Sequence, residues 1–206
     1  SVVIPSSVEY IGSMAFYNCT ELTSITIPEK VDKIRPYTFS GCGNLSSIRV
    51  AEGNKYYDSR NDCNAIIETE SNTLILGCSR TIIPNTVTKI GVSAFTRCKD
   101  LTSILIPSSV TSIESGAFAF CSNLRSINIP DSIMSIGQEA FFRCENLTSV
   151  ILPENGIEIA KDAFDGSPYK ENNKNSSTNK KDKVAVTFTY KGQLDFSIEG
   201  ECTMEM

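Results

Sequence analysis

Residues 106–124 are Ile-Pro-Ser-Ser-Val-Thr-Ser-Ile-Glu-Ser-Gly-Ala-Phe-Ala-Phe-Cys-Ser-Asn-Leu, and the pattern of this stretch recurs along the chain. Its proline belongs to a series in which neighbouring prolines are 23 residues apart. The interval from Pro28 to Pro84 is the exception and is 33 residues longer. The series is Pro5, Pro28, Pro84, Pro107, Pro130 and Pro153. Isoleucine stands six residues after every one of these prolines, and phenylalanine stands eleven residues after it. Such a fixed period indicates a repeat protein.

A unit of 23 residues is too short to bury its own apolar side chains, so each unit must pack against the next. The pattern Leu-x-x-Ile-x-Ile followed by proline predicts a short strand, because proline cannot donate a further ladder hydrogen bond. The Val-x-x-Ile pattern after the proline predicts a packed return side, and Ala-Phe-x-x-Cys has the spacing of one helical turn. The sequence therefore predicts a right-handed α/β solenoid of short strands and short helical turns.

The period divides the chain into three parts. Residues 1–169 form the predicted solenoid, in which residues 51–83 are an irregular unit with two apolar runs around a polar turn, as in a β-hairpin. Residues 170–183 contain no apolar side chain and are predicted to be a polar linker. Residues 184–206 predict a second β-hairpin, either a cap on the solenoid or the start of a truncated domain. Because residues 1–4 match the strand half of a unit, we expect the natural protein to extend upstream.

The 23-residue unit resembles the BspA-like, treponemal-type leucine-rich repeat family. Residues 106–124 carry the resemblance most clearly, and it covers residues 1 to about 169. The second half of the commoner leucine-rich consensus is replaced by Pro-x-x-Val-x-x-Ile, as in this family. The resemblance implies a surface-exposed or secreted protein that takes part in adhesion and binds a protein or glycan of a host or neighbouring cell.

The composition argues against several classes of function. The chain has no histidine, which removes the usual general base and the commonest metal ligand, so we expect no enzyme activity, cofactor or metal site. Its 24 acidic and 19 basic residues give a net charge of −5, which disfavours nucleic acid as a partner. No run of 18 apolar residues is present, so this chain is not expected to span a membrane.

Five of the eight cysteines stand at one repeat position. A ladder of this kind is a line rather than a point, so buried free thiols are favoured over an all-cysteine zinc site. Cys63 and Cys78 differ, because they would face each other if the hairpin turn is centred between Glu70 and Ser71. That register would allow a disulfide, and a shift of one residue would remove it.

One face of the predicted strands points to solvent and is lined mostly by serine and threonine. Its more distinctive outward positions form the candidate ligand face, with Thr26, Arg49, Leu105, Arg125, Asn128 and Ile151. This face is either a platform for a protein or glycan or a plain solvated sheet surface.

A second candidate surface lies just beyond the phenylalanine ladder. Arg97, Phe120 and Arg143 occupy the same position in consecutive units, with Phe142 beside them. Their spacing predicts a guanidinium–aromatic–guanidinium stack, which either packs along the surface or receives an acidic or sugar ligand.

The leading hypothesis is a non-catalytic recognition or adhesion module that binds through the solenoid face. The alternative is a structural spacer that displays or tethers another domain. An uneven, partly apolar patch on one face favours binding, whereas a uniformly polar face favours a spacer.

Overall fold

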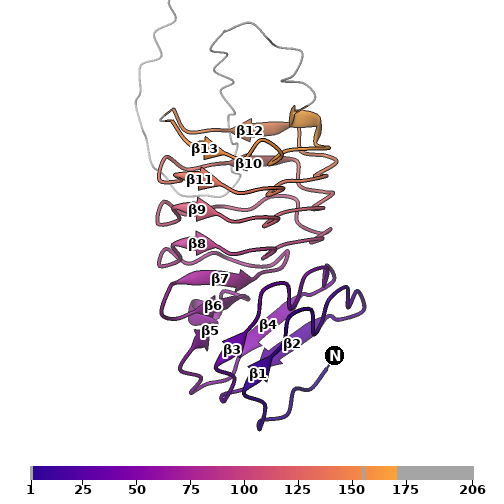
Figure 1. Ribbon diagram of the computed structural model, residues 1–206, viewed down its shortest axis with the longest axis vertical. Helices are drawn as coiled ribbons and strands as arrows, with labels where there is room; N and C mark the ends of the chain where they lie inside the picture. The colour runs from indigo at the N-terminus through magenta and orange to yellow at the C-terminus, as the bar shows by residue number, and fades with distance from the viewer. Residues whose placement is uncertain (1, 155, 171–206) are drawn as a thin grey trace, which may run out of the picture.

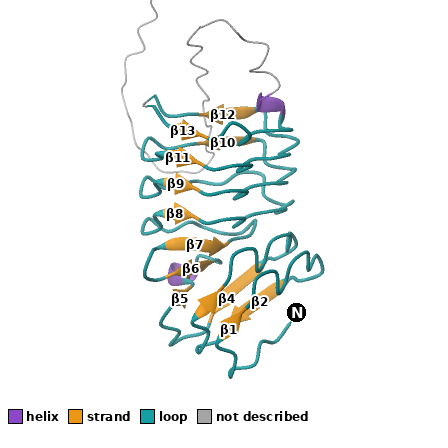
Figure 2. Cartoon of the chain, viewed as in Figure 1, coloured by secondary structure: helices purple, strands orange, loops and turns teal. Residues whose placement is uncertain are grey.

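The structure is a computed structural model that describes residues 2–154 and 156–170. The chain winds into a stack of coils, with residues 10–50 at one end and residues 149–159 at the other (Figure 1). Short strands and turns make up most of each coil (Figure 2). The predicted repeat solenoid is confirmed. The predicted hairpin at 184–206, and the linker apart from Lys170, lie outside the described residues.

One side of the coils carries strands predicted from the Leu-x-x-Ile-x-Ile pattern. They are β2 (Ser24–Ile27), β4 (Ser47–Val50), β10 (Ser126–Asn128) and β12 (Ser149–Ile151). β2 pairs in parallel with β4 and β10 with β12, each in a register of 23 residues. The strand predicted at 101–106 is not formed. The segment one coil before it, around Ile82, is not a strand either, and towards β10 the Thr102 carbonyl oxygen accepts the Arg125 N–H at 3.3 Å.

The return side of the coils also forms strands, which the sequence did not predict. They are β1 (Tyr10–Ile11), β3 (Lys33–Ile34), β8 (Lys89–Ile90), β9 (Ser112–Ile113), β11 (Ser135–Ile136) and β13 (Glu158–Ile159). Each has two residues and pairs in parallel with its neighbour, as Ile90 does with Ile113. Two residues are too few to show the alternation by which strands are recognised in a sequence.

The predicted helical turns are wrong, because the Ala-Phe-x-x-Cys segments are successive tight turns. Phe95, Phe118 and Phe141 each donate their backbone N–H to an alanine carbonyl oxygen of the next coil, at 2.7 Å. Ala117 and Ala119 instead donate to carbonyl oxygens three residues back. A helix would direct every N–H within its own segment. Alternate residues here bind the neighbouring coil, which requires a different backbone.

The irregular unit at 51–83 contains the predicted hairpin. β6 (Ile66–Glu68) and β7 (Thr73–Leu76) are antiparallel around a turn at residues 69–72. β5 (Tyr57–Asp58) adds a third antiparallel strand, and η1 (Arg60–Asp62) is a short 3-10 helix between β5 and β6. β7 then pairs in parallel with β8. The unit thereby joins the return strands in a seven-stranded sheet, ordered β13-β11-β9-β8-β7-β6-β5.

On its other side the unit meets the second coil through side chains rather than through a continued ladder. Asn54 Nδ2 donates to the carbonyl oxygens of Pro28 and Val31, and the Tyr57 hydroxyl accepts the Ile34 N–H at 2.8 Å. Asn64 Oδ1 accepts the Ile48 N–H at 2.7 Å. Because side chains replace a paired strand, β1–β4 form separate two-stranded sheets, inclined to the upper stack in Figure 1.

The interior is built on stacked phenylalanine rings in two ladders. Phe95, Phe118, Phe141 and Phe164 stack with centroids 4.9–5.2 Å apart, and Phe16 stacks on Phe39 at 5.3 Å. Gly77 ends the upper ladder, because its N–H donates to the Ala94 carbonyl oxygen in the place of a phenylalanine. A Cβ on Gly77 would lie 2.2 Å from the Phe95 ring.

The hairpin connects the two parts of the core. Ile66 and Leu76 are buried in the cluster of coils 1 and 2, whereas Ile67 and Leu74 are buried in the cluster of the later coils. Alternate side chains of one strand thus enter different cores, as the two faces of a strand require.

The cysteine ladder consists of free thiols. The thiols of Cys42, Cys121 and Cys144 each lie 3.0–3.2 Å from the backbone oxygen of the ladder phenylalanine one coil earlier. Cys63 and Cys78 are also free and lie in different core clusters, which corrects the disulfide that the hairpin register would have allowed. The predicted register holds at Ile67, but a bulge between Ile66 and Ile67 shifts it by one residue towards Cys63.

We expect Phe118→Ala to lower the free energy of unfolding by about 3–5 kcal/mol, because the ring is fully buried between two others and its loss leaves a cavity. Phe16→Ala should cost clearly less, because Phe16 stacks on one ring and is partly exposed. Guanidinium unfolding followed by circular dichroism measures both, and equal losses would contradict the stacked arrangement.

The thiols provide a second prediction. Burial raises the pKa of Cys98 and Cys144 to about 12, and raises that of Cys121 well above its usual value. Only the thiolate reacts, so near pH 8 a thiol with this pKa is reactive in about one molecule in 10⁴. Iodoacetamide should therefore label the partly exposed Cys19 of the native protein long before these three.

After denaturation without reductant, all seven described cysteines should become labelled. Peptide mapping by mass spectrometry provides the measurement. If the peptides that contain Cys63 and Cys78 are instead recovered unlabelled and linked to each other, the two residues form a disulfide and the prediction is wrong.

Candidate ligand-binding face

The six candidate residues of the strand face are all exposed. Thr26 and Arg49 lie opposite each other in β2 and β4, and Asn128 and Ile151 lie opposite each other in β10 and β12. Leu105 belongs to the segment without a strand and is 81% exposed, more than most apolar side chains of the chain. The pleat directs these positions outward because the residues on either side, such as Ile127 and Ile129, enter the core.

One member of this face, Ile82, was not predicted from the sequence. Ile82 precedes Pro84 by two residues, as Leu105 precedes Pro107 and Ile151 precedes Pro153. The 23-residue register that pairs β8 with β9 therefore places Ile82 one coil before Leu105 in the same outward column. Ile82 is 76% exposed. Its signal was present in the repeat, but the surrounding irregular unit obscured it.

The outward column is thus partly aliphatic. We name Ile82, Leu105, Asn128 and Ile151 the aliphatic strip, since three of its four members are exposed apolar residues. Ile82 and Leu105 belong to neighbouring coils, whose return strands β8 and β9 are paired, and paired strands lie about 4.8 Å apart. The uniform serine and threonine surface is broken at this strip.

Arg49 lies at a polar hollow beside the strip. The hollow has a volume of about 340 Å³ and lies between β4 and the irregular unit, lined by Arg49, Asp62, Arg80 and neighbouring serines. Arg49 Nη1 lies 3.5 Å from Asp62 Oδ1, but both side chains are largely exposed, so this ion pair contributes little stability. Two guanidinium groups are therefore available to an acidic or polar group of a ligand.

The loop that forms one wall of the hollow is held by Arg60. Its guanidinium donates to both carboxylate oxygens of Asp58, and also to Asn72 Oδ1 at 2.7 Å. The hydrogen bonds to Asp58 raise the pKa of Arg60. Asn64 at the end of the loop is fixed by bonds to Ile48 and Ser46. The wall is thus preorganised, whereas Arg49 and Arg80 are exposed and can adjust.

The second predicted surface differs from its expected geometry. The Arg97 guanidinium lies over the Phe120 ring at 5.0 Å, as predicted. Arg143, however, lies over Phe142 at 5.4 Å rather than over Phe120, because Phe142 meets the Phe120 ring edge-on at 5.3 Å. Two separate cation–π pairs replace the expected stack. The position thirteen residues after the proline has a positive φ in every coil, and the residues there are Asn18, Gly41, Arg97, Phe120, Arg143 and Gly166.

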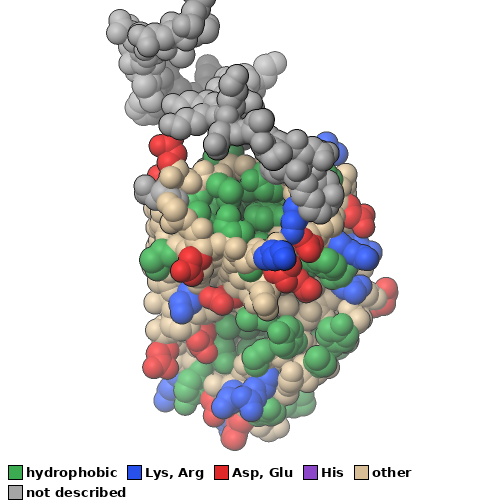
Figure 3. Space-filling model, turned by 45° about the horizontal axis from the view of Figure 1, so that its top comes forward, with side chains coloured by type: hydrophobic (Ala, Val, Ile, Leu, Met, Phe, Trp, Pro, Cys, Tyr) green, Lys and Arg blue, Asp and Glu red, His purple; other side chains and the backbone are tan. Residues whose placement is uncertain are grey.

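The charges of the molecule are mixed. Figure 3 shows acidic and basic side chains interspersed over the visible face, with apolar side chains gathered between them. Within residues 2–154 and 156–170, no group of three or more His, Cys, Asp or Glu side chains is placed to hold a metal ion. Nor is any helix among these residues both long enough and apolar enough to cross a bilayer.

Several solved bacterial structures are similar to this chain. A leucine-rich cell surface protein from Faecalibacterium prausnitzii is 33% identical, with a TM-score of 0.60 over 80% of this chain and 50% of its own. The pneumococcal vaccine antigen PcpA is 22% identical, with a TM-score of 0.70 over 81% of this chain and 48% of its own. A leucine-rich repeat protein from Eubacterium ventriosum is 19% identical, with a TM-score of 0.54 over 89% of this chain and 66% of its own. The last two likenesses concern the fold alone.

The chain spans about half the length of the first two of these structures. No curated protein matches it. The model of the BspA type leucine rich repeat region matches residues 1–65 and 71–187 in six copies, which is most of the chain. These copies include the proline-to-phenylalanine coils whose stacked rings form the core. The protein is therefore a member of the BspA type leucine rich repeat family.

Proposed function

We propose that this chain is a non-catalytic recognition or adhesion module of a cell-surface or secreted protein, and that it binds a protein or glycan through its strand face. The observation that carries the proposal is the aliphatic strip. Ile82 and Leu105 expose 76% and 81% of their surface in one column of a face that is otherwise hydroxyl-rich. A contiguous exposed apolar patch favours an interaction site, whereas single scattered residues do not.

The polar hollow at Arg49 supports the same face. Interfaces commonly combine an apolar centre with arginine and a polar rim. Arg80 lines the hollow and stands two residues before Ile82, so the hollow and the aliphatic strip are adjacent along the chain. A ligand on this face would bury the strip and place an acidic or hydroxyl group against the two guanidinium groups.

The likeness to the Faecalibacterium prausnitzii protein, whose description is a leucine rich cell surface protein, supports a location at the cell surface. A rigid stack suits such a position, because binding to a preformed face does not require the coils to become ordered. The ligand would be a macromolecule of a host or neighbouring cell.

The test is an array of glycans and extracellular-matrix proteins probed with the full chain. We expect capture of at least one component, and Ile82→Ser/Leu105→Ser should weaken it by about tenfold or more through loss of apolar contact. Met134→Ser is the matched control, since Met134 is 66% exposed but lies next to the return strand β11. Thermal unfolding verifies that both variants remain folded.

An array without any captured component would favour the structural spacer. If Ile82→Ser/Leu105→Ser and Met134→Ser weaken ligand binding equally, the strand face is not the binding site.

A further inference from the structure

A groove runs along the turn side of the coils, away from the strand face. Its volume is about 500 Å³, and residues from all six proline-marked coils line it, from Met14 in the first to Asp162 in the last. Gly43 allows this continuity across the irregular unit, because a Cβ there would lie 2.0 Å from the Arg97 carbonyl oxygen. The second coil therefore approaches the third closely at this point.

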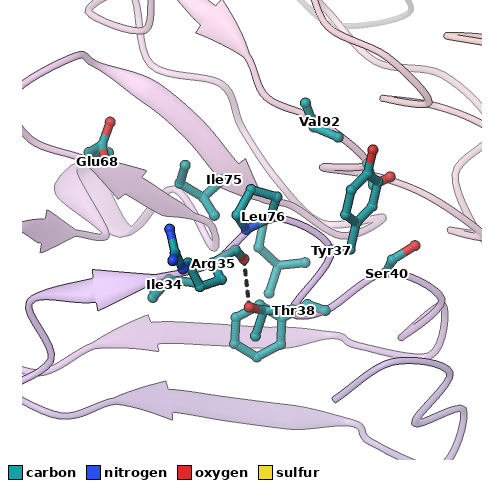
Figure 4. A pocket seen from close by; sticks show the side chains of 12 residues that line it. Ile34, Arg35, Tyr37, Thr38, Ser40, Glu68, Ile75, Leu76 and Val92 are labelled. Atoms are coloured by element: carbon teal, nitrogen blue, oxygen red, sulfur yellow. Dashed lines mark hydrogen bonds between the residues drawn. The ribbon is translucent and has the colours of Figure 1, made fainter. Parts of the chain in front are cut away.

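An apolar cleft opens beside the groove at the junction of these two coils. Figure 4 shows Ile34, Ile75, Leu76 and Val92 around it, with Tyr37 at one side and the charged Arg35 and Glu68 towards the other. The cleft has a volume of about 220 Å³ and shares Tyr37, Ser40 and Ser93 with the groove. It exists because side chains, rather than a paired strand, join the second coil to the irregular unit. A space of this kind suits one apolar side chain.

The groove changes character along its length. At the end with the early coils its walls are Met14, Tyr17 and Tyr37, which are 43–56% exposed. Small residues such as Ser93, Gly116 and Ala119 line the middle, beside Arg97 on Phe120. Glu139 and Asp162 line the other end. Neither carboxylate forms an ion pair with a residue that the structure describes.

The backbone of one groove wall is left-handed. The residues nine positions after the proline have φ between 54° and 64° in five coils, and they are Met14, Tyr37, Ser93, Gly116 and Glu139. Glycine and asparagine favour this conformation, whereas methionine, tyrosine and glutamate do not. Large side chains are therefore held at strained positions that contribute little to the core, since Met14, Tyr37 and Glu139 are all exposed. Strain of this kind clusters at functional sites.

We propose that this groove binds an extended segment of a partner polypeptide. An apolar side chain of the segment enters the junction cleft between Tyr37 and Val92, and a lysine or arginine further along reaches Glu139 and Asp162. Three lines support a polypeptide: the cleft takes one side chain, the walls carry the tyrosine, methionine and arginine typical of protein interfaces, and the unpaired carboxylates call for a cation.

The dimensions of the groove define the spacing in the segment. Ser93 and Asp162 are three coils apart, which corresponds to about 14 Å at about 4.8 Å per coil. An extended chain covers this distance in about four residues, and the junction adds one or two. The apolar and basic side chains should therefore stand about four to six residues apart.

The test uses the full chain and fluorescein-labelled peptides of about 12 residues, built from glycine and serine with one phenylalanine and one lysine at varied separation. We expect fluorescence anisotropy to show the tightest binding at separations of about four to six residues. Replacing the phenylalanine by serine, or the lysine by glutamate, should weaken binding by about tenfold or more.

Two variants of the protein test the named groups. Tyr37→Gly removes one wall of the cleft, and because glycine accepts the positive φ of 61° there, the melting temperature should not fall while binding weakens by about tenfold or more. Glu139→Lys/Asp162→Lys should abolish the preference for lysine over glutamate in the peptide. Leu105→Ser on the strand face should leave peptide binding unchanged, so the outcome is independent of the function proposed above.

The proposal is overturned if no peptide of the series binds, or if binding survives both groove variants. It is also overturned if Tyr37→Gly abolishes the binding of a glycan and leaves the binding of the peptides unchanged.

Discussion

The structure depends on the backbone hydrogen bonds that join the turn of each coil to the next. The phenylalanine N–H of one coil meets an alanine carbonyl oxygen of the following coil at 2.7 Å in three successive steps. This contact places the phenylalanine rings above one another and brings the cysteine thiols to the phenylalanine carbonyl oxygens. A unit of 23 residues cannot bury these groups alone, so each unit folds only by stacking on its neighbours.

The irregular unit interrupts this stack and is joined to the coils on both sides by hydrogen bonds. It continues the ladder on one side through β7 and closes it on the other side through Asn54, Tyr57 and Asn64. No buried side-chain nitrogen or oxygen atom in the described ranges lacks a hydrogen-bond partner. The change of direction at this unit opens the cleft at Tyr37 on the turn side and the polar hollow at Arg49 on the strand side. Both the cleft and the hollow therefore lie at the irregular unit.

The two surfaces differ in how they are formed. On the strand face, the period of two residues alternates core and solvent positions, so the aliphatic strip arises from which residue type fills one outward position. On the turn side, positive φ angles place Tyr37 and Glu139 along a groove at a conformational cost. Leu105 can be substituted without any effect on backbone strain, whereas substitution of Tyr37 by glycine would relieve the strain of its positive φ. The presence of tyrosine at this positive φ is therefore the more informative of the two observations.

The solenoid, most strands on the strand face, the hairpin in the irregular unit and the outward positions of that face could be predicted from the sequence, because they follow from spacing and from the alternation of apolar residues. The sequence did not determine the return strands, the turns in place of helices, the pairing of Arg143 with Phe142, or the register at Cys63. Each of these depends on which neighbouring coil receives a particular N–H or ring. The groove and the cleft likewise appeared only in the tertiary structure, because they lie between coils that are distant in sequence, and a periodic pattern describes one coil without describing how two unequal coils meet.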